Sequence, residues 1–367
     1  MNSHETDESD WPQAILHLDM DAFYANVHLL DHPEDTGLPI AIGGKPNQRG
    51  VVASASYEAR AAGVRSAMPM SKAIRICPSL KVVPANWPRI KSCSQQVMET
   101  LTQYGIVEKI SVDEAYVDIS GYKRPFQQST KRPLSLPETI RQHVKTVTGL
   151  PASVGLATSK LVAKVASDYD KPEGCTIVLP DQERAFLAPQ SVRVIWGIGP
   201  RTAERLAAMD ILTCGDLAAA DLILLKQQFK NQAEGLQQRA KGIDPRPVNA
   251  ERGLAKSISQ EWTFSQDSND PDLLKEKLGR MAESVSRSLT RNGLVAYTVA
   301  VKFRWSDFTT FTRQKSVTVG IDKPDDIYRL AEQLWQENWT TGQRMRLLGV
   351  RVSGIHQPQT RQLGFEF

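Results

Sequence analysis

Residues 109–120, KISVDEAYVDIS, alternate between apolar and polar side chains as a β-strand does, until two adjacent acids interrupt the pattern. These acids are Asp113 and Glu114, and the break predicts the tip of a hairpin with both acids near one edge of a sheet. A second apolar run, residues 15–20, reads as a buried strand. It runs through residues 19–21, DMD, into a stretch of helical composition, which brings its terminal acids to the sheet edge as well.

The remaining pattern predicts one order of elements twice. In each half of the chain the apolar periodicity gives β-α-β-β-α-β, which is the ferredoxin-like plan. The first half adds short inserted strands at 38–44 and 50–56, a helix at 57–63, a helix after residue 86, a helix at 137–148 and a strand at 152–156. The second half has strands at 256–264, 296–304, 314–319 and 345–353 and helices at 270–291 and 323–339.

The acids at the predicted edge need a positive partner. Neighbouring carboxylates raise each other's pKa, and burial adds to the cost unless cations neutralise them. Asp19, Asp113 and Glu114, from two strand ends, can hold two Mg²⁺ ions about 3.5–4 Å apart, an arrangement that supports phosphoryl transfer. The alternative is an ordinary hairpin turn with solvated acids. Asp21, directly before the helix, is expected to be its N-cap rather than a ligand.

Composition narrows the class of protein. The chain has 367 residues, 41% of them apolar and 23% charged, which is typical of a globular protein with more than one domain. Its net charge of +4 is compatible with nucleic-acid binding without establishing it. No apolar run is long enough to cross a membrane, and the polar, acidic residues 1–13 lack a signal-peptide core, so we expect a disordered lead-in and a cytoplasmic protein. Four scattered cysteines suggest neither a zinc site nor disulfides.

Four segments together resemble a known family. ILHLDMDAFYANV, SYEARAAGVRSAMP, ISVDEAYVDIS and ATSKLVAKVASDYDKPEG are similar, in this order and at this spacing, to the signature segments of Y-family DNA polymerases of the bacterial polymerase IV type. The resemblance runs from about residue 15 to about residue 355 and implies an α+β multidomain fold, a right-hand polymerase. It implies a ferredoxin-like palm at 14–30 and 87–178, small fingers at 31–86, a helix–hairpin–helix thumb at 179–243, a linker at 244–252, a β-α-β-β-α-β little finger at 253–355 and a flexible tail at 356–367.

The resemblance assigns roles to residues near the acids. It places Asp19, Asp113 and Glu114 on the family's catalytic, metal-binding carboxylates, in agreement with the argument from charge, and Met20 on a position whose carbonyl also reaches a metal. The implied cofactor is a pair of Mg²⁺ ions, with Mn²⁺ as a possible substitute. The nucleotide site that the resemblance implies consists of Phe23, Tyr24, Ser54, Tyr57, Arg60 and Lys171.

Within that implied site, Tyr24 falls on the steric gate, where an aromatic ring fills the space of a ribose 2′-OH. The alternative for Tyr24 is a core aromatic of an amphipathic helix, a place that its neighbour Phe23 fits better. Arg60 matches a guanidinium that grips the triphosphate, and Lys171 matches a lysine that reaches it as a mobile point charge. Asp170, directly before that lysine, could pair with it and weaken its role. The small residues facing the base imply a permissive lid and low fidelity.

Two further parts of the chain resemble DNA-binding elements of the family. The G-I-G-P stretch with Gly197 and Gly199 looks like a helix–hairpin–helix, whose amides bind a DNA phosphate, although a plain α-hairpin is the alternative. A weaker second copy is suggested around residues 235–240. Basic residues on the C-terminal strands form a candidate track for DNA phosphates, though charged strand faces are often only solvated. The track consists of Lys256, Lys302, Arg304, Arg313, Lys315, Arg344 and Arg351.

The last residues resemble the short peptide by which bacterial polymerases bind the sliding clamp. Gln362, Leu363, Phe365 and Phe367 supply its glutamine, leucine and aromatic anchors. Exposed phenylalanines at a chain end favour a partner pocket, and the alternative is a tail folded back on its own domain.

We interpret the chain as a template-directed DNA polymerase of the translesion type that adds deoxynucleotides to a primer 3′-hydroxyl and has no proofreading exonuclease. Its expected partners are primer-template DNA, a deoxynucleoside triphosphate and the sliding clamp, with no membrane and as a monomer. Two other classes stay open. A nucleotidyl cyclase would use the same acids but would not need the DNA-binding elements, and a catalytically dead DNA-binding factor would not need the acids.

Overall fold

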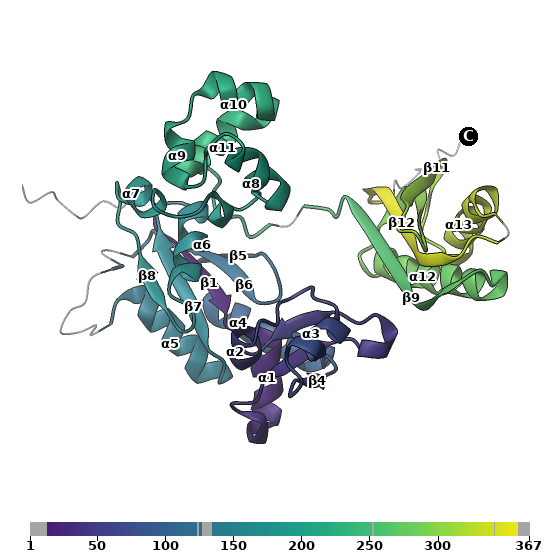
Figure 1. Ribbon diagram of the computed structural model, residues 1–367, viewed down its shortest axis with the longest axis horizontal. Coiled ribbons are helices and arrows are strands. Elements are labelled where there is room, and N and C mark those ends of the chain that lie inside the picture. The colour runs from purple at the N-terminus through teal and green to yellow at the C-terminus, as the bar shows by residue number, and fades with distance from the viewer. Residues whose placement is uncertain (1–12, 123–124, 127–133, 252, 341, 359–367) are drawn as a thin grey trace, which may run out of the picture. The chain divides into compact units, whose positions relative to one another are not determined.

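The computed structural model describes residues 13–122, 125–126, 134–251, 253–340 and 342–358 (Figure 1). The described residues form two compact units. The first unit contains the chain up to residue 251 apart from residues 44–51 and 69–72, which belong to the second unit together with the residues after 251. No helix among the described residues is long and apolar enough to cross a membrane.

The main sheet of the first unit has the strand order β5-β6-β1-β7-β8. β1 (Ile15–Met20) lies in the middle and is antiparallel to both neighbours, β6 (Glu114–Asp118) and β7 (Ala152–Ala157). β5 (Ile106–Lys109) is antiparallel to β6, and β8 (Cys175–Ile177) is parallel to β7. Without β8, the sheet has the predicted ferredoxin-like plan with the first strand inside it.

Helices cover both faces of this sheet. α4 (Trp87–Leu101) and α5 (Leu136–Thr148) pack on one face, where their apolar side chains meet those of β1, β6 and β7. α6 (Lys160–Tyr169) packs on the other face. β1 and β7 are buried along their whole lengths as a result. A strand buried on both faces tends to have a nearly continuous run of apolar or small residues, as β7 has. In β1 two polar residues, His17 and Asp19, interrupt the apolar run and are buried nonetheless.

A smaller sheet in the first unit has the order β3-β2-β4. α1 (Phe23–Asp31) connects β1 to this sheet and contributes to its core. The strands are β2 (Ile40–Gly43), β3 (Val52–Ala55) and β4 (Lys81–Val83), and the helices between β3 and β4 are α2 (Tyr57–Ala61) and α3 (Met70–Ile76).

Short helices follow β8 and share the apolar core beneath α6. They are α7 (Glu183–Leu187), α8 (Pro200–Ala207), α9 (Cys214–Ala219), α10 (Leu222–Phe229) and α11 (Ala233–Ala240). The suggested second hairpin at residues 235–240 is wrong, because these residues lie inside the continuous helix α11.

The sheet of the second unit has the order β11-β10-β12-β9, with every pair antiparallel. α12 (Pro271–Arg291) and α13 (Pro324–Asn338) pack on one face, where Val299, Val301 and Phe303 belong to the core. This confirms the predicted β-α-β-β-α-β order. The strands are β9 (Ser257–Ser268), β10 (Val295–Trp305), β11 (Thr310–Ile321) and β12 (Met345–His356).

Candidate active site at the end of strand β1

The ends of β1 and β6 bring the three predicted carboxylates to one place. Asp19 is the cross-strand partner of Glu114 in the antiparallel pair. Asp113 lies in the turn directly before β6, and its carbonyl accepts a 3.0 Å hydrogen bond from the backbone N–H of Met20. Facing residues of an antiparallel pair have Cβ atoms about 4.5–5.5 Å apart, so the side chains of Asp19 and Glu114 leave the sheet side by side. The expected hairpin with both acids at one edge is confirmed.

Lysines from α6 and the loop after it neutralise two of these carboxylates. Lys171 Nζ lies 2.8 Å from Asp19 Oδ1 and 2.8 Å from Asp168 Oδ1. Lys164 Nζ lies 2.6 Å from Glu114 Oε2. Both lysines stand on the α6 face of the sheet, toward which the two acids point. The cationic partners that the predicted edge requires are therefore supplied by the chain itself.

Burial and charge act on the two paired acids in opposite directions. Burial raises the pKa of Asp19 to about 6, a rise that the charge of Lys171 reduces. The pKa of Glu114 is held down at about 2 by the His17 ring, whose Nε2 lies 3.6 Å away, and by the Lys164 ammonium. Burial works to lower the pKa of Lys171, but the neighbouring carboxylates outweigh it and raise that pKa above its usual range. Glu114 is consequently ionised at neutral pH, whereas Asp19 depends on a cation beside it.

The carboxylates at the end of β1 are oxygen ligands of the kind that a divalent metal ion takes. As they stand, no group of three or more His, Cys, Asp or Glu side chains in the described part of the chain could hold a metal ion. Asp19 and Glu114 each hold a lysine instead, and Asp113 accepts a hydrogen bond from the Ser111 hydroxyl. The donor set nevertheless consists of carboxylate oxygens beside main-chain carbonyls, which Mg²⁺ and Mn²⁺ prefer. The residues fit a divalent ion if the lysines move away.

A cavity of about 160 Å³ lies beside the carboxylates. It has the acids on one side and two cations, Arg60 and Lys171, on its wall. Two predicted residues, Glu114 and Tyr57, are missing from the lining. The predicted residues that do line it are Asp19, Met20, Phe23, Tyr24, Ser54, Arg60, Asp113 and Lys171.

Of the two aromatic residues at the start of α1, Phe23 takes the core place expected of it, and Tyr24 is only partly buried. Phe23 is 2% exposed and belongs to the core under the main sheet. Tyr24 is partly buried against Trp87, with ring centroids 5.6 Å apart in an edge-on arrangement. Burial, aided by the charge of Asp113, raises the pKa of Tyr24. Its ring is therefore neutral and lies at the cavity wall beside a metal-ligand candidate.

The prediction that Asp21 caps α1 is wrong. Ala22 is the N-cap, with a left-handed backbone (φ 41°), and no side chain caps the helix. The turn at Ala22 sends Asp21 inward, where it is 1% exposed. Its carboxylate accepts hydrogen bonds from the Ser153 hydroxyl, the Tyr57 hydroxyl and the backbone N–H of Glu173. Asp21 lies between Met20 and Ala22 in the sequence, and nothing in that pattern indicates that its carboxylate is a buried hydrogen-bond acceptor.

The sequence left open whether Lys171 pairs with Asp170, and the structure gives the lysine other partners. Its partners are Asp19 and Asp168. Asp168 is three residues earlier, one turn back on α6, and that spacing is the available sequence signal for the pair. The lysine is thus held at the carboxylate edge rather than on its own loop.

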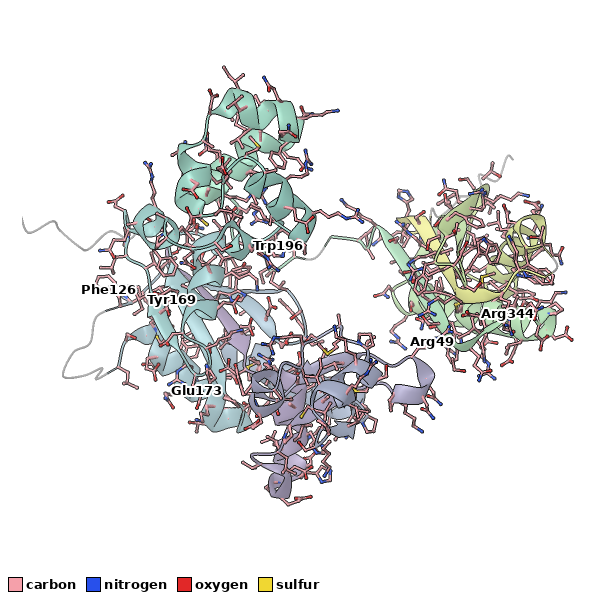
Figure 2. All side chains as sticks on the ribbon, in the orientation of Figure 1. Arg49, Phe126, Tyr169, Glu173, Trp196 and Arg344 are labelled. Atoms are coloured by element: carbon pink, nitrogen blue, oxygen red, sulfur yellow. The ribbon has the colours of Figure 1, made fainter. Side chains whose placement is uncertain are left out.

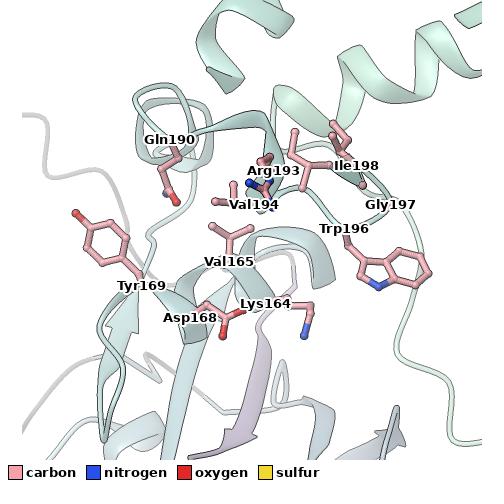
Figure 3. Close-up of a pocket in the computed structure, with 12 residues that line it drawn as sticks. Lys164, Val165, Asp168, Tyr169, Gln190, Arg193, Val194, Trp196, Gly197 and Ile198 are labelled. Atoms are coloured by element: carbon pink, nitrogen blue, oxygen red, sulfur yellow. The ribbon is translucent and has the colours of Figure 1, made fainter. Parts of the chain in front are cut away.

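The Gly-rich hairpin of the predicted DNA site lies before α8. Gly197 has a left-handed backbone (φ 95°), and Gly199 is the N-cap of α8. Close by, a cavity of about 520 Å³ separates the hairpin from α6 (Figure 3). Lys164 and Arg193 contribute positive charge to its wall, and Trp196, 63% exposed, stands at the hairpin (Figures 2 and 3). The hairpin is therefore accessible beside a partly basic hollow.

The strand register separates the predicted basic track into two faces. Lys302 pairs with Gly349 and Thr312, and Arg304 pairs with Thr310, so both basic side chains lie on the sheet face opposite α12 and α13. Arg313 pairs with Val301 and Lys315 with Val299, whose side chains are in the core. These two cations lie on the helix side of the edge strand, where Lys315 bonds to Gln333 of α13. The remaining members are Lys256, exposed before β9; Arg344, before β12; and Arg351, on the open face.

The predicted clamp-binding residues lie outside the described part of the chain. They are Gln362, Leu363, Phe365 and Phe367.

Comparison with known proteins agrees with this architecture. Residues 18–168 match the model of the impB/mucB/samB family, and residues 255–365 match the model of its C-terminal domain. DNA polymerase IV of Halorhodospira halophila is 40% identical over 95% of this chain and 96% of its own length. DNA polymerase IV of Alkalilimnicola ehrlichii is 39% identical over 95% of this chain and 98% of its own length.

Solved structures give the same result. A Y-family DNA polymerase chimera of Dbh and Dpo4 superposes with a TM-score of 0.81 at 26% identity, covering 93% of this chain and 99% of the chimera. DinB from Sulfolobus solfataricus superposes with a TM-score of 0.61 at 26% identity, covering 93% and 98%. The chain belongs to the Y-family of DNA polymerases. It is a DNA-directed DNA polymerase of the translesion type, and enzymes of this family need divalent metal ions.

Proposed function

We propose that Asp19, Asp113 and Glu114, with the Met20 carbonyl, hold two Mg²⁺ ions for nucleotidyl transfer, and that Mn²⁺ can replace them. The observation that carries the proposal is the cross-strand pair of Asp19 and Glu114, with Asp113 at the adjoining turn beside a cavity walled by cations. When bound, the ions activate the primer 3′-hydroxyl and stabilise the charge that develops on the transferred phosphorus and on the leaving pyrophosphate.

The side chains around the cavity bind and orient the nucleotide. Arg60 and Lys171 neutralise the triphosphate, and Lys171 releases Asp19 as it does so, which frees that carboxylate for a metal ion. Lys164 likewise has to leave Glu114. The ring of Tyr24 occupies the space of a 2′-hydroxyl, and Ser54 lies on the same wall. Holding the triphosphate and the primer end in register converts a bimolecular reaction into a nearly unimolecular one.

Primer-template DNA binds through two regions. The hairpin at Gly197 and Gly199 directs the N-terminus of α8 toward a phosphate, which needs no particular base sequence. Lys302 and Arg304 add phosphate contacts on the open face of the second unit's sheet. A structural neighbour, Dbh, is described as a ternary complex, which supports binding of DNA and a nucleotide together.

Further assignments rest on the family resemblance. We assign the main sheet with α4, α5 and α6 to the palm, the small sheet to the fingers, the helices from α7 to α11 to the thumb and the second unit's sheet to the little finger. Gln362, Leu363, Phe365 and Phe367 serve the sliding clamp. The polymerase acts as a monomer in the cytoplasm.

A primer-extension assay tests the proposed mechanism. The wild-type protein is incubated with a primed template, Mg²⁺ and one deoxynucleotide or ribonucleotide at a time, beside Asp113→Ala and Tyr24→Ala. We expect extension that follows the template, disappears in Asp113→Ala and accepts ribonucleotides in Tyr24→Ala. Turnover of triphosphate without DNA would favour a cyclase instead. DNA binding without any extension would contradict the enzyme and leave a binding factor.

A further inference from the structure

The buried carboxylate of Asp21 connects three segments that are distant in sequence. Ser153 Oγ of β7 lies 3.0 Å from both Asp21 oxygens, the Tyr57 hydroxyl of α2 donates to Oδ1 at 3.1 Å, and the backbone N–H of Glu173 donates to Oδ2 at 2.8 Å. Glu173, labelled in Figure 2, lies in the loop after α6. All these donors are neutral groups, and a buried carboxylate is stable only when such donors satisfy it.

Each contact leads to one of the two cations on the cavity wall. Lys171 is two residues before Glu173, so the 2.8 Å bond to the Glu173 N–H fixes the loop that carries the lysine. Ser153 holds the same loop a second time, because its Oγ accepts a 3.2 Å hydrogen bond from the Gly174 N–H.

The other contact leads to Arg60. Its guanidinium stands over the Tyr57 ring, 4.8 Å from the ring centroid, and its Nε donates to the Ala55 carbonyl at 3.0 Å. The Tyr57 ring is held in turn by its hydroxyl bond to Asp21. Tyr57 itself does not line the cavity, and its only hydroxyl proton points away toward Asp21. Its position therefore supports the arginine rather than presenting a hydroxyl to a ligand.

We propose that Asp21 is a positioning residue for the incoming nucleotide: it sets the place of Arg60 through Tyr57 and the place of Lys171 through the Glu173 loop. The inference rests on the proposed function, in which those two cations bind the triphosphate. Asp21 touches neither the metal ions nor the substrate in this role. Its removal loosens both cations at once, so nucleotide binding suffers while the carboxylate edge and the DNA-binding regions stay in place.

The test measures the KM for the deoxynucleotide, the kcat and the Kd for primer-template DNA, with the melting temperature as a check of folding. Asp21→Ala is expected to raise the KM about tenfold or more, since it removes charge-assisted hydrogen bonds from two supports, and to change the DNA Kd less than about twofold. Binding of a deoxynucleotide to a complex with a dideoxy-terminated primer gives the same comparison without catalysis.

The matched control is Asp35→Asn, another buried aspartate of the first unit. Asp35 is 3% exposed and bonds to Lys81 and His28, away from the cavity. The Asp35→Asn variant is expected to have a lower melting temperature and an unchanged KM. If Asp21→Ala lowers the melting temperature to the same extent but leaves the KM unchanged, its role is only structural and the proposal fails.

A mutant cycle, with Asp21→Ala as one change and the pair Tyr57→Phe, Lys171→Ala as the other, tests the route of the effect. If Asp21 acts through its neighbours, Asp21→Ala should raise the KM much less in a Tyr57→Phe, Lys171→Ala background than in the wild type. Equal effects in the two backgrounds contradict the proposal. Should Asp21→Ala not fold, Ser153→Ala removes one anchor of the carboxylate, and an unchanged KM in that variant is equally contradictory. Failure of the proposed function itself is detected separately. If Arg60 and Lys171 do not bind the triphosphate, the single variants Arg60→Ala and Lys171→Ala will have a normal KM for the deoxynucleotide.

Discussion

The sheet that contains β1 and the sheet that contains β10 are built from the same order of strands and helices along the chain. They differ in where the first strand of that order lies within the sheet. In the first unit β1 lies between β6 and β7, whereas in the second unit the first strand, β9, is at the edge. The first sheet is covered by helices on both faces, and the second only on one within the described chain. Burial on both faces makes β1 a rigid support for an acid at its end, while an open face leaves room for a large polyanion.

This difference shows why the acids belong to one unit and the basic face to the other. Asp19 faces Glu114 only because β1 and β6 are neighbours. In the second unit the corresponding strands, β9 and β11, lie at opposite edges of the sheet. On its open face Lys302 and Arg304 are partly exposed, and Lys302 Nζ lies 2.8 Å from a carboxylate oxygen of Glu261. Under the proposed function, the same element order serves catalysis in one unit and DNA contact in the other.

The largest effect is expected at the end of β1. Asp19→Asn should lower the rate of nucleotide incorporation about 10³-fold or more, because it removes a carboxylate of the proposed metal site. The matched control is Asp118→Asn, at the other end of β6, where the carboxylate accepts hydrogen bonds from the backbone N–H and the hydroxyl of Ser120. Single-turnover incorporation measures both. Similar losses of incorporation rate in the two variants would contradict a special role for the strand ends at Asp19.

The difference in helix coverage between the two sheets can be tested by measuring how substitutions on each face change the free energy of unfolding. Phe303→Ala should lower the free energy of unfolding of the second unit by about 3–5 kcal/mol, because Phe303 is fully buried under the helices. Lys302→Ala, at the preceding residue on the open face, should change the free energy of unfolding by less than about 0.5 kcal/mol. In β1, by contrast, Ile15→Ala and Leu16→Ala should both cost about 2–5 kcal/mol, because successive residues face separate cores.

Denaturant unfolding followed by hydrogen exchange assigns each change to its unit. The contrast would be lost if Lys302→Ala and Phe303→Ala were equally destabilising, or if one of the two β1 variants were neutral.

The smallest effect is expected on the open face. Lys302→Ala with Arg304→Ala should reduce the slope of log affinity for DNA against log salt by about 2, since each removes one phosphate contact. Arg313→Ala with Lys315→Ala, on the helix side, is the matched control of equal charge and should reduce the slope by less than about 1. Fluorescence anisotropy over a salt series measures both. Equal reductions would show that the face of the sheet does not decide DNA contact.

Much of this arrangement is predictable from the sequence, because apolar periodicity marks the strands and helices of both units and a charge pair marks the hairpin. Strand order is not predictable from that pattern, since β-α-β-β-α-β is compatible with β1 inside the sheet and β9 at its edge. The face on which Arg313 lies is not predictable either, because it depends on the register in which β11 pairs with β10.

The local errors have a physical cause as well. Asp21 looked like a helix cap because the sequence does not show the left-handed backbone of Ala22, which turns the carboxylate inward. The partner of Lys171 was left open by the sequence, and in the structure the lysine pairs with Asp168 and Asp19. The first outcome depends on the local backbone at Ala22, and the second depends on Asp19, which is distant from Lys171 in the sequence.

The most direct test of the central claim is the number of metal ions held at the end of β1. Mn²⁺ binding is measured by electron paramagnetic resonance in the complex with dideoxy-terminated primer-template DNA and a deoxynucleotide, for the wild type and for Asp113→Asn. The account predicts two bound ions in the wild type and fewer in Asp113→Asn, with DNA affinity retained. An equal number in the two proteins, or none in the wild type, would contradict the assignment of these carboxylates as the metal site.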